Sequence, residues 1–232
     1  MGGATGTGAT TAEARLTAVR TRLREAAEAA GRDVEELTLV AVSKTHPAAA
    51  VRELAGLGLR EFGEARWQEL GPKSEELAGV DLRWHFLGRL QRNKARAVGR
   101  VATVVHSLDR PELCAPLGRG AADAGRELDV FVQVSLDGDS ARGGVVIEDL
   151  AHLTDTAATT EGLRLAGLMA VVPLGAAPRP AFARLRQLAE QVRTRHPGAV
   201  ELSAGMSGDL EEAVAEGATH LRIGTALFGS RA

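Results

Sequence analysis

Short apolar runs alternate with longer stretches of helical spacing along most of this chain. The run from Leu37 to Val42 is too short for a helix, is partly β-branched, and is apolar on both faces, as a strand buried in a parallel sheet should be. The same alternation continues to the end of the chain. It predicts strands at 59–63, 82–88, 101–108, 128–136, 163–172, 200–204 and 220–228.

The stretches between these runs place apolar residues at helical intervals. The first, residues 12–30, carries Leu16, Val19 and Leu23 among arginines and glutamates, and Gly31 follows it. Proline near several starts and glycine near several ends support the helix boundaries. The pattern predicts further helices at 47–57, 65–78, 90–99, 111–125, 145–160, 179–195 and 209–217.

Strict alternation of strand and helix predicts a parallel α/β sheet with helical crossovers. Eight strands in about 220 ordered residues favour a closed (β/α)₈ TIM barrel, which typically takes about 250 residues. An open doubly wound sheet is the alternative. No break in composition marks a second domain. We therefore expect one barrel over residues 12–232, led by an N-terminal helix and preceded by a flexible tail at residues 1–11.

Composition narrows the class of protein. The formal net charge of −2 argues against broad nucleic-acid binding, which needs a concentrated basic surface. No apolar run reaches the roughly 18 residues of a membrane span, and the first residues lack the features of a signal peptide. The single cysteine, Cys114, excludes an internal disulfide and a cysteine-based zinc site, and its helical setting indicates a core residue. The histidines show no i, i+4 pairing, so no metal site is expected. We expect a cytoplasmic protein.

Lysine is rare in this chain. Only Lys44, Lys73 and Lys94 stand among 28 basic residues. A guanidinium stays protonated, whereas a desolvated lysine amine attacks carbonyl carbons. Lys44 directly follows the first strand, at the end of a barrel that carries function, and shares a strand face with two valines. We expect it to point inward, with a pKa lowered by burial, as Schiff-base formation requires. The alternative is a structural ion pair with Glu64 or Asp109.

The loops after the last two strands carry small and hydroxylic residues. Residues 203–209 read SAGMSGD before a predicted helix, where Ser207 is a candidate N-cap, and Gly224 and Thr225 follow the eighth strand. Many barrels hold a phosphate at these two loops. Arg222 lies between two apolar residues that should face the outer helices, so its side chain is expected to point into the barrel. There it would pair with a carboxylate or donate to a ring nitrogen of a cofactor. A lysine amine, two loops suited to a phosphate and an arginine that points inward together describe a site for pyridoxal 5′-phosphate (PLP).

Seven segments extend this interpretation to a family. They are LVAVSKTHP (39–47), FGEARWQEL (62–70), WHFLGRLQRNKAR (84–96), VHSLDR (105–110), QVSLDGDSARGGV (133–145), GLMAVVP (167–173) and ELSAGMSGDLEEAVAEGATHLRIGTALFG (201–229). On these segments the chain resembles the pyridoxal phosphate homeostasis protein family, which is similar to the barrel domain of alanine racemase.

The resemblance implies a set of cofactor contacts. The set comprises Lys44, His85, Met169, Ser203, Gly205, Met206, Ser207, Arg222, Gly224 and Thr225. Within it, Lys44 forms the Schiff base and Arg222 contacts the pyridine nitrogen. The loops at 203–207 and 224–225 hold the phosphate. His85 and Met169 line the pocket.

The chain departs from the family pattern in two places. Ala65 stands where the family usually has asparagine after the FGE motif, so a hydrogen bond to the cofactor ring would be missing if that asparagine makes one. Arg89 and Arg92 replace smaller residues and make the stretch 89–100 basic. This stretch is interpreted as a solvated helix face. The alternative is a docking patch for a partner or for an incoming phosphorylated vitamer.

Three functions are compatible with such a site. The first is a PLP-binding protein of intracellular PLP homeostasis that holds the cofactor without substantial turnover. Its partners would be PLP, other B6 vitamers and apo-enzymes that receive the cofactor. The second is a PLP-dependent enzyme such as a weak amino-acid racemase, and the third is a lysine aldolase acting on a sugar phosphate.

The racemase is disfavoured because alanine racemase takes its second acid/base from a tyrosine of an added domain, and this chain has no tyrosine. A guanidinium donating to the ring nitrogen also disfavours protonation of that nitrogen, which weakens the ring as an electron sink. Without the racemase's second domain, which helps to build its dimer, we expect a monomer.

Overall fold

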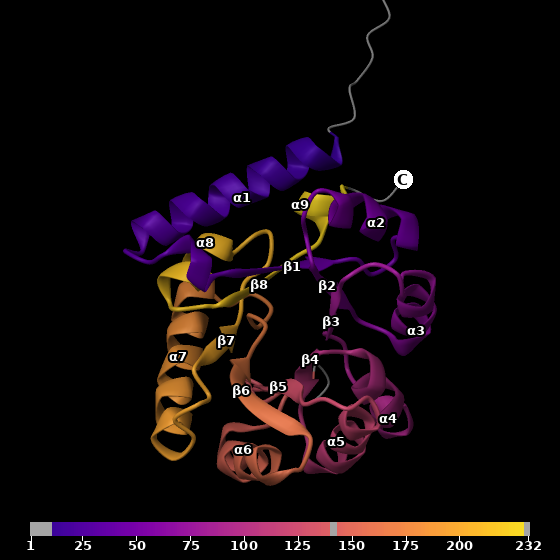
Figure 1. Cartoon of the computed structure of the whole chain (residues 1–232). Helices are drawn as coiled ribbons and strands as arrows, with labels where there is room; N and C mark the ends of the chain where they lie inside the picture. Colours follow the sequence, from indigo (N-terminus) through magenta and orange to yellow (C-terminus); the bar gives the residue numbers. More distant parts are fainter. Residues whose placement is uncertain (1–10, 140–142, 230–232) are drawn as a thin grey trace, which may run out of the picture.

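Eight parallel strands form a closed barrel in the computed structural model, which describes residues 11–139 and 143–229 (Figure 1). Each strand pairs with its neighbour in sequence, and β1 pairs with β8 to close the ring. This confirms the predicted barrel and excludes the open sheet. The strands are β1 (Thr38–Val42), β2 (Glu61–Glu64), β3 (Arg83–Phe86), β4 (Val104–Leu108), β5 (Leu128–Gln133), β6 (Leu163–Met169), β7 (Glu201–Ser203) and β8 (His220–Ile223).

Helices surround the barrel and follow the predicted order. The α-helices are α1 (Ala12–Ala29), α2 (Ala48–Gly56), α3 (Trp67–Glu76), α4 (Arg92–Val101), α5 (Cys114–Asp123), α6 (Leu150–Thr159), α7 (Pro178–Arg195), α8 (Leu210–Ala215) and α9 (Thr225–Phe228). Short 3₁₀ turns occur at η1 (Val34–Glu36), η2 (Pro111–Leu113) and η4 (Ile147–Asp149). Of the predicted tail, only Thr11 lies within the described residues, and its hydroxyl accepts the N–H of Ala14 at the start of α1.

Two predicted boundaries at the end of the chain are wrong. The strand expected over 220–228 ends at Ile223, because the chain turns at Gly224 and continues as α9. Ser207 is not a helix N-cap, since α8 begins only at Leu210 with Asp209 before it. The Asp209 carboxylate instead accepts the N–H of Met206 at 2.6 Å and holds residues 206–209 as a turn. The barrel therefore ends here in a turn over residues 206–209 and in the short helix α9.

The hydrophobic core lies between the barrel and its helices. Strand residues such as Phe62, Val105 and Leu221 are fully buried there, and each such side chain contributes about 1.5–3 kcal/mol by burial. Cys114 is buried in this layer as expected, and desolvation raises its pKa to about 11. A smaller cluster of Val104, Phe131, Ala166 and Met169 is separate from it. The helical layer therefore supplies most of the apolar burial.

Helix α1 packs across α8 and α9, as Figure 1 shows, and ties the start of the chain to its end. Leu16, Val19 and Leu23 are buried on its inner face. Arg15 donates to the carbonyl of Leu227 at 2.6 Å, and Arg22 pairs with Glu211 at 2.8 Å. The loops after β7 and β8 are therefore braced from outside the barrel.

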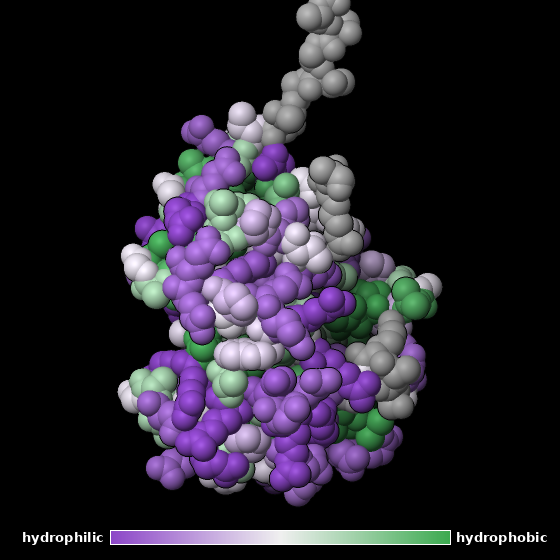
Figure 2. All heavy atoms as spheres, turned by 90° about the vertical axis from the view of Figure 1, so that its right-hand side faces the viewer, coloured by the Kyte–Doolittle hydropathy of each residue, from purple (hydrophilic) through white to green (hydrophobic). Residues whose placement is uncertain are grey.

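Hydrophilic side chains cover most of the face that carries α2, α3 and α4 (Figure 2). Within residues 11–139 and 143–229, no helix combines the length and apolar character needed to cross a bilayer. Four large apolar residues are exposed in the described part of the chain: Val171, Leu174, Val200 and Met206. Two of these, Val171 and Met206, line the cavity described next.

Candidate functional site at the barrel mouth

A cavity of about 520 Å³ opens at the carboxyl ends of the strands. It lies at the end of the barrel where the loops after the strands meet, which is where barrels of this kind carry function. Its lining consists of Val42, Lys44, Thr45, His46, Ala65, Leu87, Gly88, Val171, Met206, Ser207, Gly208, Arg222, Gly224, Thr225 and Gly229. The structure thus brings together six of the ten predicted cofactor contacts, which are Lys44, Met206, Ser207, Arg222, Gly224 and Thr225.

The other four predicted contacts are not part of this lining. Met169 packs in the small apolar cluster, with 2% of its surface exposed. His85 and Ser203 are fully buried on β3 and β7, where both make side-chain hydrogen bonds. Gly205 has a positive φ of 86°, and its carbonyl accepts the N–H of Arg222 at 3.0 Å. Two of the four, Ser203 and Gly205, contact Arg222, which lines the cavity.

Lys44 lies at the mouth of the cavity, two residues after the end of β1. Its side chain has no hydrogen bond or ion pair with any described residue. The expected alternative partners are occupied elsewhere, since Glu64 pairs with Lys73 and Asp109 with Arg110. The expectation that the barrel buries this amine is wrong, because the residue is exposed where the cavity opens to solvent. Lys44 therefore presents an unengaged amine at the rim.

The turn that carries Lys44 rests on a buried group of charges. Lys73 donates to the Glu64 carboxylate at 2.5 Å and to the carbonyl of Ser43 at 2.9 Å, and the Ser43 hydroxyl donates to the same carboxylate oxygen at 2.6 Å. Together with Glu69 we call these residues the lysine cluster. Burial raises the pKa of the Glu64 carboxyl, although its bonds to Lys73 and Ser43 oppose the change. The cluster fixes the backbone just before Lys44.

Thr45, the residue after Lys44, has an unusual backbone conformation. Its φ of 68° lies in the left-handed region, which a β-branched residue rarely adopts, at a cost of about 1–2 kcal/mol. The Thr45 N–H donates to Glu69 at 2.5 Å, and Glu69 in turn lies 3.4 Å from the Lys73 amine. Strain that the surroundings hold in place is typical of functional positions. Here it sets the direction in which the chain leaves Lys44.

The loops after β7 and β8, beside β1 in the ring, offer hydrogen-bond donors. The hydroxyls of Ser207 and Thr225 and the backbone N–H groups of residues 207, 208, 225 and 226 have no partner among the described residues. Gly224 approaches β1 so closely that a Cβ there would lie 3.3 Å from the carbonyl of Val42. Two loops without bulky side chains thus bring several donors to one side of the cavity, as an anion requires.

Arg222 reaches the cavity from inside the barrel. Its flanking residues Leu221 and Ile223 belong to the outer core, as predicted, and Arg222 itself is only 6% exposed, unlike a surface arginine. It donates to the Ser203 hydroxyl at 2.5 Å and to the carbonyl of Ala170 at 3.0 Å. No carboxylate among the described residues forms an ion pair with it. Desolvation lowers its pKa to about 10, so it remains charged at neutral pH.

Nine lining residues were not among the predicted cofactor contacts, although Ala65 was noted as a departure from the family pattern. Most of the nine lie at or shortly after the carboxyl end of a predicted strand, which was the available signal, and His46 belongs to the SKTHP segment. Its ring stacks on Phe228 with centroids 4.8 Å apart, so the loop after β1 contacts α9 across the mouth. Ala65 is also part of the lining, so the departure from the family's asparagine changes the cavity itself.

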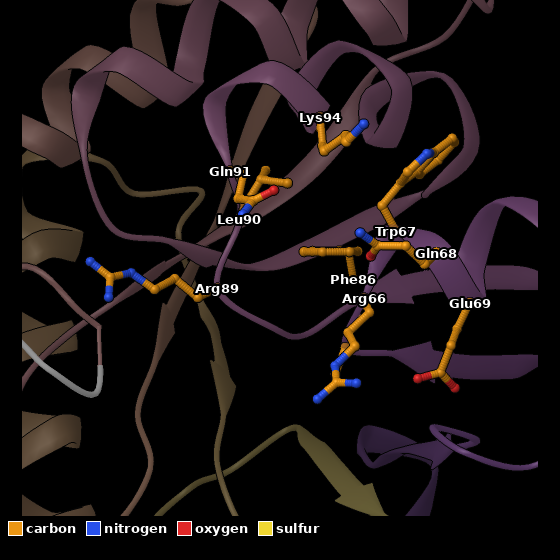
Figure 3. A pocket seen from close by; sticks show the side chains of 10 residues that line it. Arg66, Trp67, Gln68, Glu69, Phe86, Arg89, Leu90, Gln91 and Lys94 are labelled. Carbon is orange, nitrogen blue, oxygen red and sulfur yellow. The ribbon is translucent and has the colours of Figure 1, made fainter.

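A second cavity, of about 440 Å³, adjoins the first at Ala65 (Figure 3). It lies between the starts of α3 and α4 and includes the cations Arg66, Arg89 and Lys94. In Figure 3 the side chains of Lys94, Arg66 and Arg89 extend in different directions. The cations therefore do not converge on one point.

The basic stretch 89–100 divides between the second cavity and the helix surface. Arg96 and Arg100 both pair with Asp123 of α5 at 2.8 Å, which favours the interpretation of this part as a solvated, ion-paired helix face. Arg92 is exposed on the same helix. The two pairs account for the arginines at the end of the stretch without any partner protein.

Comparison with known proteins places these features among relatives. A family model described as "Alanine racemase, N-terminal domain" matches residues 14–232. The pyridoxal phosphate homeostasis protein of Pseudomonas aeruginosa is 46% identical over 216 residues, which cover 92% of this chain and 93% of that protein. The structure of PipY from Synechococcus elongatus with PLP bound has a TM-score of 0.83 at 38% identity, covering 94% of this chain and 100% of PipY. Alanine racemase from Corynebacterium glutamicum shares the fold alone, with a TM-score of 0.65, 16% identity, and coverage of 91% of this chain and 60% of the racemase.

Proposed function

The chain belongs to the pyridoxal phosphate homeostasis protein family, built on the barrel of the alanine racemase N-terminal domain, and from this we propose that it binds PLP in the cavity at the barrel mouth. It holds the cofactor as a Schiff base on Lys44 without substantial catalytic turnover, and serves intracellular PLP homeostasis. The observation that carries the proposal is the lining of one cavity by an unengaged amine, a buried guanidinium and two donor-rich loops.

The donor set of the cavity fits PLP at its phosphate, its ring nitrogen and its aldehyde. The loops at Ser207 and Thr225 offer hydroxyls and unpaired N–H groups for a phosphate. Arg222 offers a charged donor for a ring nitrogen, and Lys44 offers an amine for the aldehyde. When bound, PLP supplies that aldehyde, which condenses with a neutral amine with loss of one water. Apolar Val171 and Met206 give the ring a partly apolar wall.

The arrangement supports holding the cofactor rather than using it. The sequence has no tyrosine, so the second acid/base that a two-sided racemase needs has no phenol to supply it. Arg222 stays charged at neutral pH and donates hydrogen bonds rather than a proton, which keeps a ring nitrogen unprotonated. An unprotonated ring is a weak electron sink, so proton abstraction from a bound amino acid is slow.

The test of the proposal is a titration of the purified full chain with PLP, followed by visible absorption and by intact mass after borohydride reduction. We expect an absorption band at about 420 nm and one covalent adduct. Lys44→Ala abolishes both, and Lys94→Ala, the matched control among three lysines, keeps both. An adduct that persists in Lys44→Ala would overturn the assignment of the amine. A wild-type protein that gains neither band nor adduct would overturn PLP binding and favour a sugar phosphate. Robust racemase, transaminase or decarboxylase activity would overturn the carrier function.

A further inference from the structure

A continuous chain of polar side chains crosses the interior of the barrel and ends at Arg222. Arg222 donates to the Ser203 hydroxyl at 2.5 Å, and Ser203 lies 2.6 Å from Nδ1 of His106. Nε2 of His106 lies 2.8 Å from Nδ1 of His85, and Nε2 of His85 lies 2.6 Å from the Glu61 carboxylate. We call these five residues the histidine chain.

The histidine chain joins five strands that are distant in sequence. Its members lie on β2, β3, β4, β7 and β8, and His85, His106 and Ser203 have no exposed surface. Glu61 is the first residue of β2, so the chain begins at the amino-terminal end of the barrel. Arg222 lies at the other end and lines the cavity. The chain thus connects a carboxylate far from the cavity with a cation inside it.

Both ends of the chain fix the direction of every hydrogen bond. A guanidinium only donates and a carboxylate only accepts. The carboxylate accepts from Nε2–H of His85, so a neutral His85 accepts at Nδ1 from Nε2–H of His106. A neutral His106 in turn accepts at Nδ1 from the Ser203 hydroxyl, whose oxygen accepts from Arg222. With both histidines neutral, this is the one arrangement that satisfies all four bonds, and both rings are in the Nε2–H form.

We propose that Glu61, His85, His106 and Ser203 are positioning residues that hold the Arg222 guanidinium in one orientation toward the ligand in the cavity. This rests on the proposed function, in which the ligand is PLP and Arg222 meets its ring nitrogen. The residues act through Arg222 and do not touch the ligand, since none of them lines the cavity.

The chain holds a charge in place and does not conduct a proton. Shifting each proton one step would leave Arg222 neutral and Glu61 protonated. The pKa of Arg222 is about 10, and the bond to His85 helps to lower that of Glu61 below its ordinary value despite burial. These pKa values differ by more than five, so the shifted state is disfavoured by more than about 10⁵-fold. Arg222 therefore remains a charged donor, whichever ligand it meets.

The surroundings keep the histidines neutral near physiological pH. His220 packs against His85 and His106 with ring centroids 6.1 and 5.9 Å away, and Arg83 pairs with Glu61 at 3.1 Å. Burial lowers the pKa of all three histidines, that of His220 to about 3. Arg83 also lies 3.8 Å from the Asp129 carboxylate. The described histidines form no group suited to hold a metal ion. Burial thus favours the neutral form of both histidines in the chain at neutral and alkaline pH.

The experiment compares Ser203→Ala with Ser107→Ala in the full chain loaded with PLP. Ser107 is a matched control because it is equally buried, one residue from His106, and its hydroxyl has no partner. We expect Ser203→Ala to weaken PLP binding about tenfold and to make the absorption band depend on pH between about 6 and 9. Ser203→Thr restores both properties, and Glu61→Gln causes a smaller loss of about threefold. Ser107→Ala behaves as wild type.

Two results would overturn the positioning role without touching the proposed function. One is that Ser203→Ala and Glu61→Gln both bind PLP with the affinity of Ser107→Ala and show the same absorption band as that variant. The other comes from ¹⁵N NMR of the unloaded wild-type protein, where the proposal expects both His85 and His106 as Nε2–H tautomers. A proton on Nδ1 of His106 contradicts the chain even if a variant fails to fold. A wild-type protein that does not bind PLP defeats the proposed function, while the NMR result still decides whether the chain exists.

Discussion

Two buried polar networks support lining residues of the cavity, one beneath the turn of Lys44 and one behind Arg222, and they compensate charge in different ways. In the lysine cluster, Lys73 and Glu64 are in direct contact beneath the turn of Lys44. In the histidine chain, the opposite charges of Arg222 and Glu61 lie at the two ends of three neutral groups. The first network stabilises one turn from below, whereas the second fixes an orientation across the whole barrel. A buried cation is thus accommodated either by contact or by an oriented chain of hydrogen bonds.

The largest expected effect is the loss of the contact pair. Lys73→Met leaves the Glu64 carboxylate without its cation in a fully buried site, and we expect the free energy of unfolding to fall by about 3–5 kcal/mol. Urea denaturation measures the change. The control is the double variant Lys73→Met with Glu64→Leu, which should recover most of the loss because apolar replacement of a buried pair is often neutral. A loss below about 1 kcal/mol in the single variant would show that contact with Lys73 does not compensate the buried charge of Glu64.

The second prediction separates the networks by acidification. The folded-state pKa values of His85, His106 and His220 lie below the unfolded value of about 6.5, so the unfolded chain binds more protons as the pH falls. Their stabilising contribution is present above about pH 6.5 and is lost below it. At pH 5.5 we expect a loss of about 3 kcal/mol in the free energy of unfolding. Glu64 has the opposite sign, because its raised pKa favours the folded state in acid.

Urea titrations at pH 7.5, 6.5 and 5.5 measure this loss. The control is His220→Asn, which removes one of the three titrating rings and should flatten the dependence by about one third. Stability that stays constant from pH 7.5 to 5.5 would contradict the neutral, buried state of the histidines.

The smallest effect concerns the strained turn. Thr45→Gly relieves the left-handed conformation, and we expect the free energy of unfolding to rise by about 0.5–1 kcal/mol. The Thr45 N–H bond to Glu69 does not depend on the side chain and should persist. Thermal denaturation measures the change. The control is Thr225→Gly at the first residue of α9, where φ is not positive. A destabilisation of Thr45→Gly equal to that of the control would mean that the turn stores no strain.

The barrel could be predicted because its signal is local and repeated. Each strand from β1 to β8 overlaps one of the predicted runs, although β2 (EFGE) and β3 (RWHF) are only partly apolar. Arg222 between two outward-facing residues showed its inward direction. The end of β8 was missed because the apolar residues of 225–228 suit a strand and a short helix equally, and only the turn at Gly224 decides between them.

The networks could not be predicted, because their partners meet only in three dimensions. His106 and Ser203 are 97 residues apart, and no spacing along the chain relates His85, His106 and His220. The burial of Lys44 was predicted wrongly for a similar reason. A strand face gives the direction of a side chain, but the height of the surrounding loops decides whether solvent reaches it.

Because β1 is paired with β8, the amine that follows the first strand and the donors that follow the last strand lie side by side in the ring. During synthesis, the ribosome therefore releases Lys44 long before Gly224 and Thr225 emerge. Until then, the nascent polypeptide carries a reactive side chain without the groups that retain a ligand beside it. Retention of a ligand thus becomes possible only after β8 has emerged and the ring has closed.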